Sequence, residues 1–268
     1  MADPNYVHGY SARESTRLAD QASTLSELLH HDTAYAAGDR VLECGCGTGA
    51  QTVLLAANSP EARIVSVDVS VESLGLARRR VEEAGGRNVV FGVADVYRPP
   101  FENENFDHVF VCFVLEHLSN PVEALVALKR VLRPGGSLTV IEGDHGSWYC
   151  YPQTPAASRA VECLIEIQAR AGGDALIGRR LHPLLVEAGY RKVQVSPRMV
   201  YVDSSRPHLV EGFSKNTFIA MVEGVRDAAI SAGLVDADVW EQGIADLYRA
   251  TAVDGTFCYT FFKATAVK

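Results

Sequence analysis

Residues 41–52 read Val-Leu-Glu-Cys-Gly-Cys-Gly-Thr-Gly-Ala-Gln-Thr, an apolar strand that runs directly into a glycine-rich turn. The glycines at positions 45, 47 and 49 tolerate positive φ and let backbone N–H groups approach a ligand with no Cβ in the way. A helix is expected to follow at once, over residues 48–58, with its unpaired N–H groups and positive dipole end directed at the turn. This arrangement is typical of a cofactor-binding loop.

Two classes of cofactor could use this turn. The pattern Gly-x-Gly-x-x-Ala over residues 45–50 satisfies the dinucleotide fingerprint, and Asp68 follows at about the expected ~20-residue offset. Glu43, however, puts an acid inside the turn, where it would repel a pyrophosphate and attract a cationic ligand. Asp95 ends a second strand pattern, over residues 88–95, and is placed where an acid could meet an adenine amino group.

Two later segments favour the second class. Residues 106–117 read Phe-Asp-His-Val-Phe-Val-Cys-Phe-Val-Leu-Glu-His, and residues 128–136 read Leu-Lys-Arg-Val-Leu-Arg-Pro-Gly-Gly. Together with the glycine turn, Asp68 and Ala94-Asp95, these segments closely resemble the class I S-adenosylmethionine-dependent methyltransferases over residues 38–145. The resemblance implies S-adenosylmethionine as the cofactor and S-adenosylhomocysteine as the product. A nicotinamide-dependent enzyme stays open as the alternative for the glycine turn.

The resemblance also implies which residues hold the cofactor. The glycines make room for its amino acid end, Glu43 faces the ammonium directly or through water, and Asp68 accepts two hydrogen bonds from the ribose hydroxyls. Each role has a simpler alternative: Asp68 could cap the next helix, Asp95 could close a turn, and His117 could be a surface loop residue. The expected cofactor-binding residues are Tyr10, Glu43, Gly45, Cys46, Gly47, Asp68, Val69, Ala94, Asp95, Val96, Phe113 and His117.

Strand and helix patterns alternate after the turn, which predicts a parallel sheet. The resemblance implies a Rossmann-like α/β fold with seven strands, mostly parallel, with an antiparallel last strand between strands five and six and helices on both faces. We expect a core of residues 38–203 and 253–268. Residues 1–37 should form a helical lid or flank, with an amphipathic helix over about 12–30. Residues 204–252 should form a helical insertion that caps the substrate.

The acceptor should be chosen beyond residue 143. Residues 143–152, Gly-Asp-His-Gly-Ser-Trp-Tyr-Cys-Tyr-Pro, form a loop that is too rich in aromatic and ionisable groups to be a mere connector. A hydroxyl or carbon acid usually needs a base to remove its proton, whereas a neutral amine does not. His145 is the favoured base, with Glu142 beside it. The alternative is that His145 only bonds loop backbone.

Composition bears on partners and compartment. The formal net charge of −8, with 25 Lys and Arg against 33 Asp and Glu, is unlike that of a nucleic-acid-binding enzyme. The longest apolar run, residues 109–115, is too short to cross a bilayer. The first residues lack the basic and apolar regions of a secretory signal, so a cytoplasmic protein is expected. The six cysteines lack paired Cys-x-x-Cys spacing, which favours reduced thiols and no metal site.

These observations predict a methyltransferase that acts on a small molecule, with no nucleic-acid or membrane partner. A looser resemblance, to small-molecule methyltransferases of microbial metabolism, rests on the segment around Tyr10 and on residues 49–52. Two rivals are a protein-directed methyltransferase that docks its partner on residues 204–252, and a non-catalytic module that keeps the cofactor as a structural ligand. The sequence does not give the acceptor, the atom methylated or the oligomeric state, for which a homodimer is one option.

Overall fold

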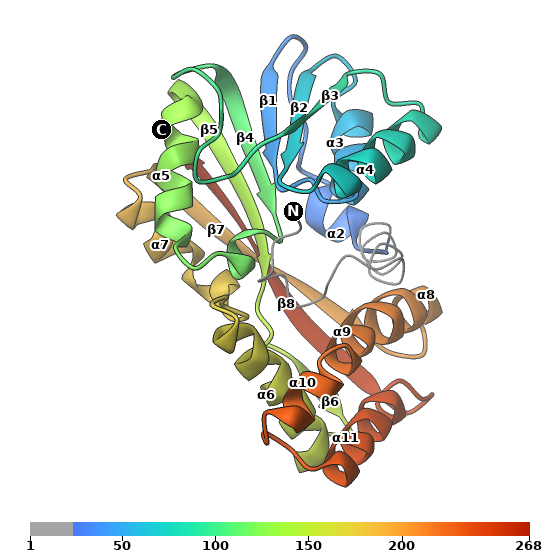
Figure 1. The fold of residues 1–268 in the computed structure, drawn as a ribbon. Helices are drawn as coiled ribbons and strands as arrows, with labels where there is room; N and C mark the ends of the chain where they lie inside the picture. Colours follow the sequence, from blue (N-terminus) through green and yellow to red (C-terminus); the bar gives the residue numbers. More distant parts are fainter. Residues whose placement is uncertain (1–23) are drawn as a thin grey trace.

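A computed structural model describes residues 24–268 and shows one eight-stranded sheet with helices on both sides (Figure 1). The strand order is β3-β2-β1-β4-β5-β8-β6. Strand β7 pairs with β8 along the edge opposite to β5 and β6. The strands are β1 (Arg40–Cys44), β2 (Arg63–Asp68), β3 (Val89–Val93), β4 (Phe106–Cys112), β5 (Leu132–Gly143), β6 (Tyr149–Tyr151), β7 (Arg191–Val202) and β8 (Thr256–Val267).

Strands β1 to β5 are mutually parallel, whereas β8 is antiparallel to both β5 and β7. The last strand therefore lies between the fifth and the next long strand, as predicted. Because β1 to β5 are parallel, their carboxyl ends meet at one edge of the sheet, where ligands bind in open α/β sheets.

Two hydrophobic clusters fill the two faces of the sheet. One contains Leu42, Val109 and Val111 from the central strands and packs against α5 (Pro121–Val131) and α7 (Leu181–Glu187). The other contains Leu55 of α3 (Ala50–Asn58) and extends to α6 (Pro155–Arg170). Helix α4 (Val71–Glu83) packs beside α3. The predicted α/β architecture, with helices on both faces, is confirmed.

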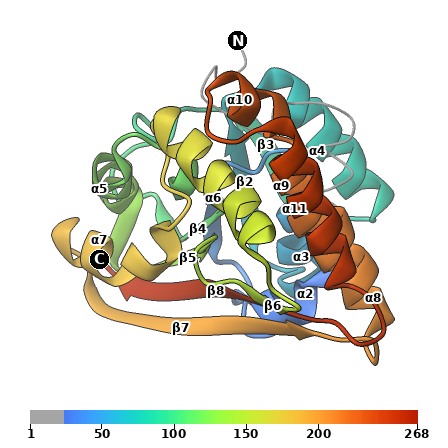
Figure 2. The same cartoon turned by 90° about the horizontal axis from the view of Figure 1, so that it is seen from below.

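The segment expected as a helical insertion is helical throughout most of its length and lies beside α6 at the β6 end of the sheet (Figure 2). It begins with α8 (Pro207–Leu209), which leads into a ten-residue π-helical segment, η3 (Val210–Ile219). It continues through α9 (Ala220–Glu223), α10 (Arg226–Ser231) and α11 (Ala237–Arg249). The aromatic side chains of η3 join the same cluster as Leu55, so the insertion shares the core of the sheet rather than building its own.

Three expectations need correction or fall partly outside the structure. The sheet has eight strands instead of seven, because Tyr149–Tyr151 of the expected loop pairs with residues 256–258 of β8. The resemblance implies that Leu-Arg-Pro-Gly-Gly at residues 132–136 is a turn before strand five, whereas β5 already starts at Leu132. Of the amphipathic helix expected over residues 12–30, the structure describes only its end, α2 (Ser26–His30), with Leu25 and Leu29 buried.

Candidate functional site

The glycine turn between β1 and α3 has the backbone that its sequence predicts. Gly45, Gly47 and Gly49 have φ values of +74°, +50° and +79°, a region that favours glycine. A Cβ at Gly45 would lie 2.4 Å from Val114, and one at Gly49 would lie 2.8 Å from the Ala77 backbone. A Cβ at Gly47 would meet no atom of the described residues within 4 Å. Gly45 and Gly49 therefore serve close packing, whereas Gly47 borders open space.

Asp68, at the carboxyl end of β2, bonds directly to this turn. Its Oδ2 accepts a hydrogen bond of 2.8 Å from the backbone N–H of Gly47, and its Oδ1 accepts one of 2.9 Å from Ser70. Burial raises the pKa of Asp68, while these backbone donors oppose the rise. The helix cap itself is the hydroxyl of Ser70, which accepts from the N–H of Ser73. Each carboxylate oxygen keeps a further lone pair for a ligand hydroxyl.

Glu43 is buried beneath the turn, at 2% exposure. Its Oε2 accepts hydrogen bonds from Thr52 Oγ1 at 2.7 Å and from Ser66 Oγ at 2.6 Å. Burial raises the pKa of Glu43 to about 7, although the two hydroxyl donors oppose that rise. The carboxyl group thus ties β1 to α3 and β2, a contact that the sequence alone did not indicate.

The expected adenine side lies at the ends of β3 and β4. Asp95 is exposed, and its Oδ1 accepts from the backbone N–H of Tyr97 at 2.9 Å while its carbonyl accepts from that of Arg98 at 3.0 Å. Asp95 therefore closes a turn through its Oδ1 and its carbonyl oxygen. Ala94 is buried, Val96 is partly buried, and Phe113 holds a positive φ of 57° just after β4.

The remaining expected cofactor residues differ in where they lie. Val69 follows Asp68 and is 40% exposed, while Cys46 is buried in the turn at 6% exposure. His117 ends the short 3₁₀ helix η1 (Leu115–His117) after β4, with Nε2 3.7 Å from Glu116 Oε1. Tyr10 lies outside the described residues.

His145 is buried in the loop after β5, at 4% exposure, and faces two residues from other elements. Its Nδ1 lies 2.7 Å from the hydroxyl of Tyr259 on β8. Its Nε2 lies 3.7 Å from Oε2 of Glu116 in η1. The sequence predicted His145 beside the site. The contact with Tyr259 was missed, because no local pattern distinguishes Tyr259 from the other three aromatic residues of β8.

Glu142, the second expected catalytic residue, is fully buried at the end of β5. Its Oε1 accepts hydrogen bonds of 3.0 Å and 2.8 Å from the backbone N–H groups of Val114 and Leu115. Burial, together with the nearby Glu116 carboxylate, raises the pKa of Glu142 well above its usual range. These bonds fix the loop between β4 and η1, so Glu142 contributes to the site by shaping its floor.

Asp144, next to Glu142 and His145, has a structural partner. It is 2% exposed and forms a bidentate pair with Arg179, with Nε–Oδ2 and Nη2–Oδ1 distances of 2.7 Å and 2.8 Å. This pair fixes the loop in which His145 lies.

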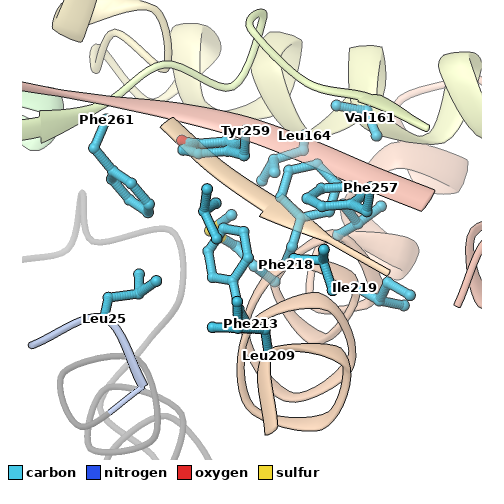
Figure 3. Packing of buried hydrophobic residues seen from close by; sticks show 14 of the residues in the cluster. Leu25, Val161, Leu164, Leu209, Phe213, Phe218, Ile219, Phe257, Tyr259 and Phe261 are labelled. Carbon is cyan, nitrogen blue, oxygen red and sulfur yellow. The ribbon is translucent and has the colours of Figure 1, made fainter. Parts of the chain in front are cut away.

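Aromatic rings surround Tyr259 on the side of the insertion (Figure 3). Its ring centroid lies 4.7 Å from that of Phe261 and 5.7 Å from those of Phe213 and Phe218. Phe213 and Phe218 belong to η3, so the insertion packs directly on the ring whose hydroxyl faces His145. Tyr259 therefore lies between the aromatic side chains of η3 and the imidazole of His145.

Three general properties concern the described part of the chain as a whole. None of the helices within residues 24–268 is both long and apolar enough to cross a membrane. The same residues contain no group of three or more His, Cys, Asp or Glu side chains that could hold a metal ion. All six cysteines are buried and form no disulfide.

Comparisons with known proteins agree with this geometry. Residues 42–140 match a family described as "Methyltransferase domain". The chain is 33% identical over 232 residues to an uncharacterised 37.1 kDa protein in transposon TN4556 of Streptomyces fradiae, covering 81% of this chain and 66% of that one. It is 31% identical over 144 residues to 27-O-demethylrifamycin SV methyltransferase of Amycolatopsis mediterranei, covering 51% and 50%.

A solved structure shares the fold. The crystal structure of a methyltransferase from Bacillus halodurans C-125 aligns with a TM-score of 0.57 and 18% identity, over 92% of this chain and 99% of that one. The chain spans 66%, 56% and 50% of the length of three of the curated relatives that it matches.

Proposed function

We propose that the chain is a class I S-adenosylmethionine-dependent methyltransferase that transfers a methyl group to a small-molecule acceptor, which the match of residues 42–140 to a methyltransferase domain supports. The observation that carries this proposal is the direct bond between the Asp68 carboxylate and the backbone of the glycine turn at Gly47. This bond places the carboxylate that would bind the ribose of the cofactor next to the backbone N–H groups that would bind its amino acid end.

The residues of the turn fit this cofactor. Gly47 borders open space that a larger side chain would fill, and its positive φ favours glycine. The Asp68 carboxylate at the edge of that space has lone pairs for vicinal hydroxyls. The buried Glu43 supplies a negative field beneath the turn for an ammonium or sulfonium group. When bound, S-adenosylmethionine would supply an activated methyl group on a sulfonium, so the protein's task is to hold and aim the reactants.

The other cofactor roles follow from position. We assign Asp95 to the adenine amino group, with Ala94, Val96 and Phe113 as apolar walls. Val69, beside Asp68, and His117, after β4, complete the rim of the proposed site. Tyr10 would close over it, as part of a lid formed by residues 1–37.

For the acceptor we propose a small metabolite, held between the carboxyl ends of β4 and β5 and a cap formed by residues 204–252. The net charge of −8 supports a partner other than nucleic acid. The relative from Amycolatopsis acts, by its name, on a small molecule. We assign His145 as the base and Glu142 as the group that holds the neighbouring loop. A homodimer is the assembly we propose, with the chain in the cytoplasm.

A thermal-shift titration with S-adenosylmethionine, S-adenosylhomocysteine and NAD(H) tests the cofactor. A ligand at ~100 times its dissociation constant should stabilise the protein by about 2.7 kcal/mol. We expect both adenosyl sulfur compounds to raise the melting temperature and NAD(H) to leave it unchanged. The Asp68→Ala variant should lose the shift, and Asp227→Ala, at a fully solvated acid of α10, should keep it.

The outcomes separate the alternatives. A shift with NAD(H) alone would show that the dinucleotide fingerprint was the true signal. A shift with S-adenosylmethionine, but no transfer of labelled methyl to any compound of a cell extract, would favour the non-catalytic module. Label that appears in protein instead of small molecules would favour the protein-directed enzyme. Because Asp68 also bonds the turn, Asp95→Asn serves as a second variant, since asparagine keeps an oxygen that can accept from the N–H of Tyr97.

A further inference from the structure

Three ionisable side chains from three different elements form a buried chain of contacts. Tyr259 comes from β8, His145 from the loop after β5, and Glu116 from η1. The Tyr259 hydroxyl lies 2.7 Å from His145 Nδ1, and His145 Nε2 lies 3.7 Å from Glu116 Oε2. Their exposures are 2%, 4% and 8%. A hydroxyl, an imidazole and a carboxylate in this order are the components of a proton-transfer relay.

The partners of Glu116 determine the direction of the relay. Gln168, fully buried in α6, donates its side-chain N–H to Glu116 Oε2 at 3.0 Å. At 3.7 Å the Glu116 carboxylate is within ion-pair distance of His145 Nε2, and a carboxylate favours a proton on the imidazole nitrogen that faces it. In neutral His145 that nitrogen is Nε2, and Nδ1 is then the basic nitrogen. Tyr259 consequently donates its hydroxyl proton to His145.

The backbone around these side chains is shaped to fit them. A Cβ at Gly143 would lie 2.4 Å from the Tyr259 hydroxyl, and one at Gly173 would lie 2.5 Å from the Glu116 carbonyl oxygen. Glycine at both positions therefore makes room for the relay. The ring of Tyr259 packs against the rings of Phe213 and Phe261, and its hydroxyl lies at His145 Nδ1 (Figure 3).

We propose that Tyr259 is the catalytic residue that meets the acceptor, that His145 takes the proton from Tyr259, that Glu116 positions His145, and that the acceptor is a hydroxyl compound. This deepens the proposed function and rests on it. It also moves the direct contact with the acceptor from His145 to Tyr259.

The proton and electron balance is complete. The acceptor oxygen forms a bond to the methyl carbon with its lone pair, and the carbon–sulfur bond breaks with its electrons staying on sulfur. The acceptor O–H proton goes to the Tyr259 oxygen as the Tyr259 proton goes to His145 Nδ1. The resulting imidazolium faces the Glu116 carboxylate. Burial, with nearby Glu116 and Asp144, raises the pKa of Tyr259 well above its usual range, so the tyrosine passes a proton on without standing as a phenolate.

Long-range ¹H–¹⁵N spectra of the histidine side chains test the relay without any acceptor. In the S-adenosylhomocysteine-saturated protein at neutral pH, we expect His145 to be the Nε2–H tautomer. Tyr259→Phe should shift the Nδ1 resonance, and Glu116→Gln should weaken the tautomer preference. Tyr190→Phe is the matched control, because its buried hydroxyl donates to the Leu125 carbonyl in another part of the core. A proton on Nδ1 in the unchanged protein, or spectra that Tyr259→Phe leaves unaltered, would overturn the relay.

A matched pair of acceptor probes tests the hydroxyl assignment. With S-adenosylmethionine, we expect methylation of 2-naphthol and none of 2-naphthylamine. Tyr259→Phe should lower kcat for the naphthol by about 100-fold or more. The KM for S-adenosylmethionine should not change, and Tyr190→Phe should behave as the unchanged protein. Methylation of the amine alone, at a rate that Tyr259→Phe does not change, would overturn the inference and leave the proposed function standing. Failure of the proposed function is distinguished by the absence of a thermal shift with S-adenosylmethionine.

Discussion

At the scale of single residues, the ionisation of buried groups gives the sharpest expectations, and Glu43 is the first. Burial raises its pKa to about 7 from an ordinary value of 4.5. Between these values the folded protein binds more protons than the unfolded chain, so stability falls as pH rises. In the cofactor-free protein we expect this carboxyl group to remove roughly 2 to 3 kcal/mol of unfolding free energy between pH 5 and pH 8.

Urea unfolding of Glu43→Gln at both pH values checks this. Glutamine keeps an oxygen that can accept from Ser66 and Thr52 and cannot ionise, so the difference between variant and unchanged protein should grow as pH rises. A difference that is the same at pH 5 and pH 8 would contradict the shift.

His30, at the end of α2, should act in the opposite direction. It is 3% exposed beside Phe110, and burial lowers its pKa to about 4 from 6.5. As pH falls from 6.5 to about 4, the imidazole of His30 becomes protonated in the unfolded chain but stays neutral in the folded protein. The free energy of unfolding therefore decreases as pH falls through this range. We expect a loss of about 2 kcal/mol between pH 7 and pH 5.

The variant His30→Leu should remove this loss, as measured by urea unfolding at pH 7 and pH 5. His182→Leu is the control at an exposed histidine of α7. If the two variants show the same dependence on pH, burial of His30 does not control its ionisation.

At the scale of elements, Lys263 of β8 fastens α2 to the sheet. Its Nζ, on a side chain 3% exposed, donates to the Leu29 carbonyl at 3.2 Å, and to Asp32 Oδ1 and Thr33 Oγ1 at 2.5 Å each. Lys263→Met keeps the length of the side chain and removes all three bonds. We expect a loss of about 2 to 4 kcal/mol in unfolding free energy, because the buried Leu29 carbonyl and Thr33 hydroxyl lose this donor.

Amide hydrogen exchange locates this loss. The amides of Leu29 and His31, which bond to Leu25 and Glu27, should exchange faster in Lys263→Met, while the central strands keep their relative protection. Lys215→Met breaks only a partly exposed pair with Glu211 and should change stability by less than about 0.5 kcal/mol. Unaltered exchange at Leu29 would show that the fastening role is wrong.

Local patterns predicted the elements that bury a continuous apolar stripe or carry a turn signal. Asn120 and Pro121 are a cap residue followed by a first-turn proline, a pattern that starts a helix, and the Asn120 side chain caps α5 by accepting from the N–H of Glu123. Strand β6 was missed because its three residues form a strand only by pairing with residues 256–258, more than a hundred positions away. The sequence also did not predict the π-helical form of η3. Its residues show no local pattern for that form, and Phe218 of η3 packs against Phe257 of the distant strand β8.

The cofactor side and the acceptor side of the candidate site differ in how far local sequence predicts them. Asp68 and the glycine turn could be predicted because strand ends and glycine spacing are local signals, and β1 and β2 are neighbours in sequence and in space. Tyr259 could not, because its contact with His145 spans 114 residues and depends on an antiparallel strand entering the sheet last. Glu43 was recognised as an acid beside the turn, but its hydroxyl partners come from packing.

At the scale of the whole molecule, the insertion and the sheet should unfold together. A single cluster of buried residues contains Phe110 of β4, Leu55 of α3, Phe218 of η3 and Trp240 of α11. Removing the helices of residues 204–252 would expose the apolar side chains of the sheet that they cover, and the reverse also holds. The sheet and these helices should therefore unfold as one cooperative unit. We expect urea unfolding followed by tryptophan fluorescence and by far-UV circular dichroism to give one coincident transition.

The two probes sample different regions, which makes the comparison decisive. Both tryptophans, Trp148 and Trp240, lie on the side of the insertion, whereas circular dichroism reports the whole chain. Phe218→Ala, at a side chain 1% exposed, should cost about 3 to 5 kcal/mol and shift both curves equally with an unchanged slope. Val253→Ala, at a side chain 83% exposed, should shift neither. If the fluorescence change precedes the dichroism change in the unaltered protein, residues 204–252 form a separate unit, and a cap that opens without unfolding the sheet becomes the better account of how an acceptor reaches Tyr259.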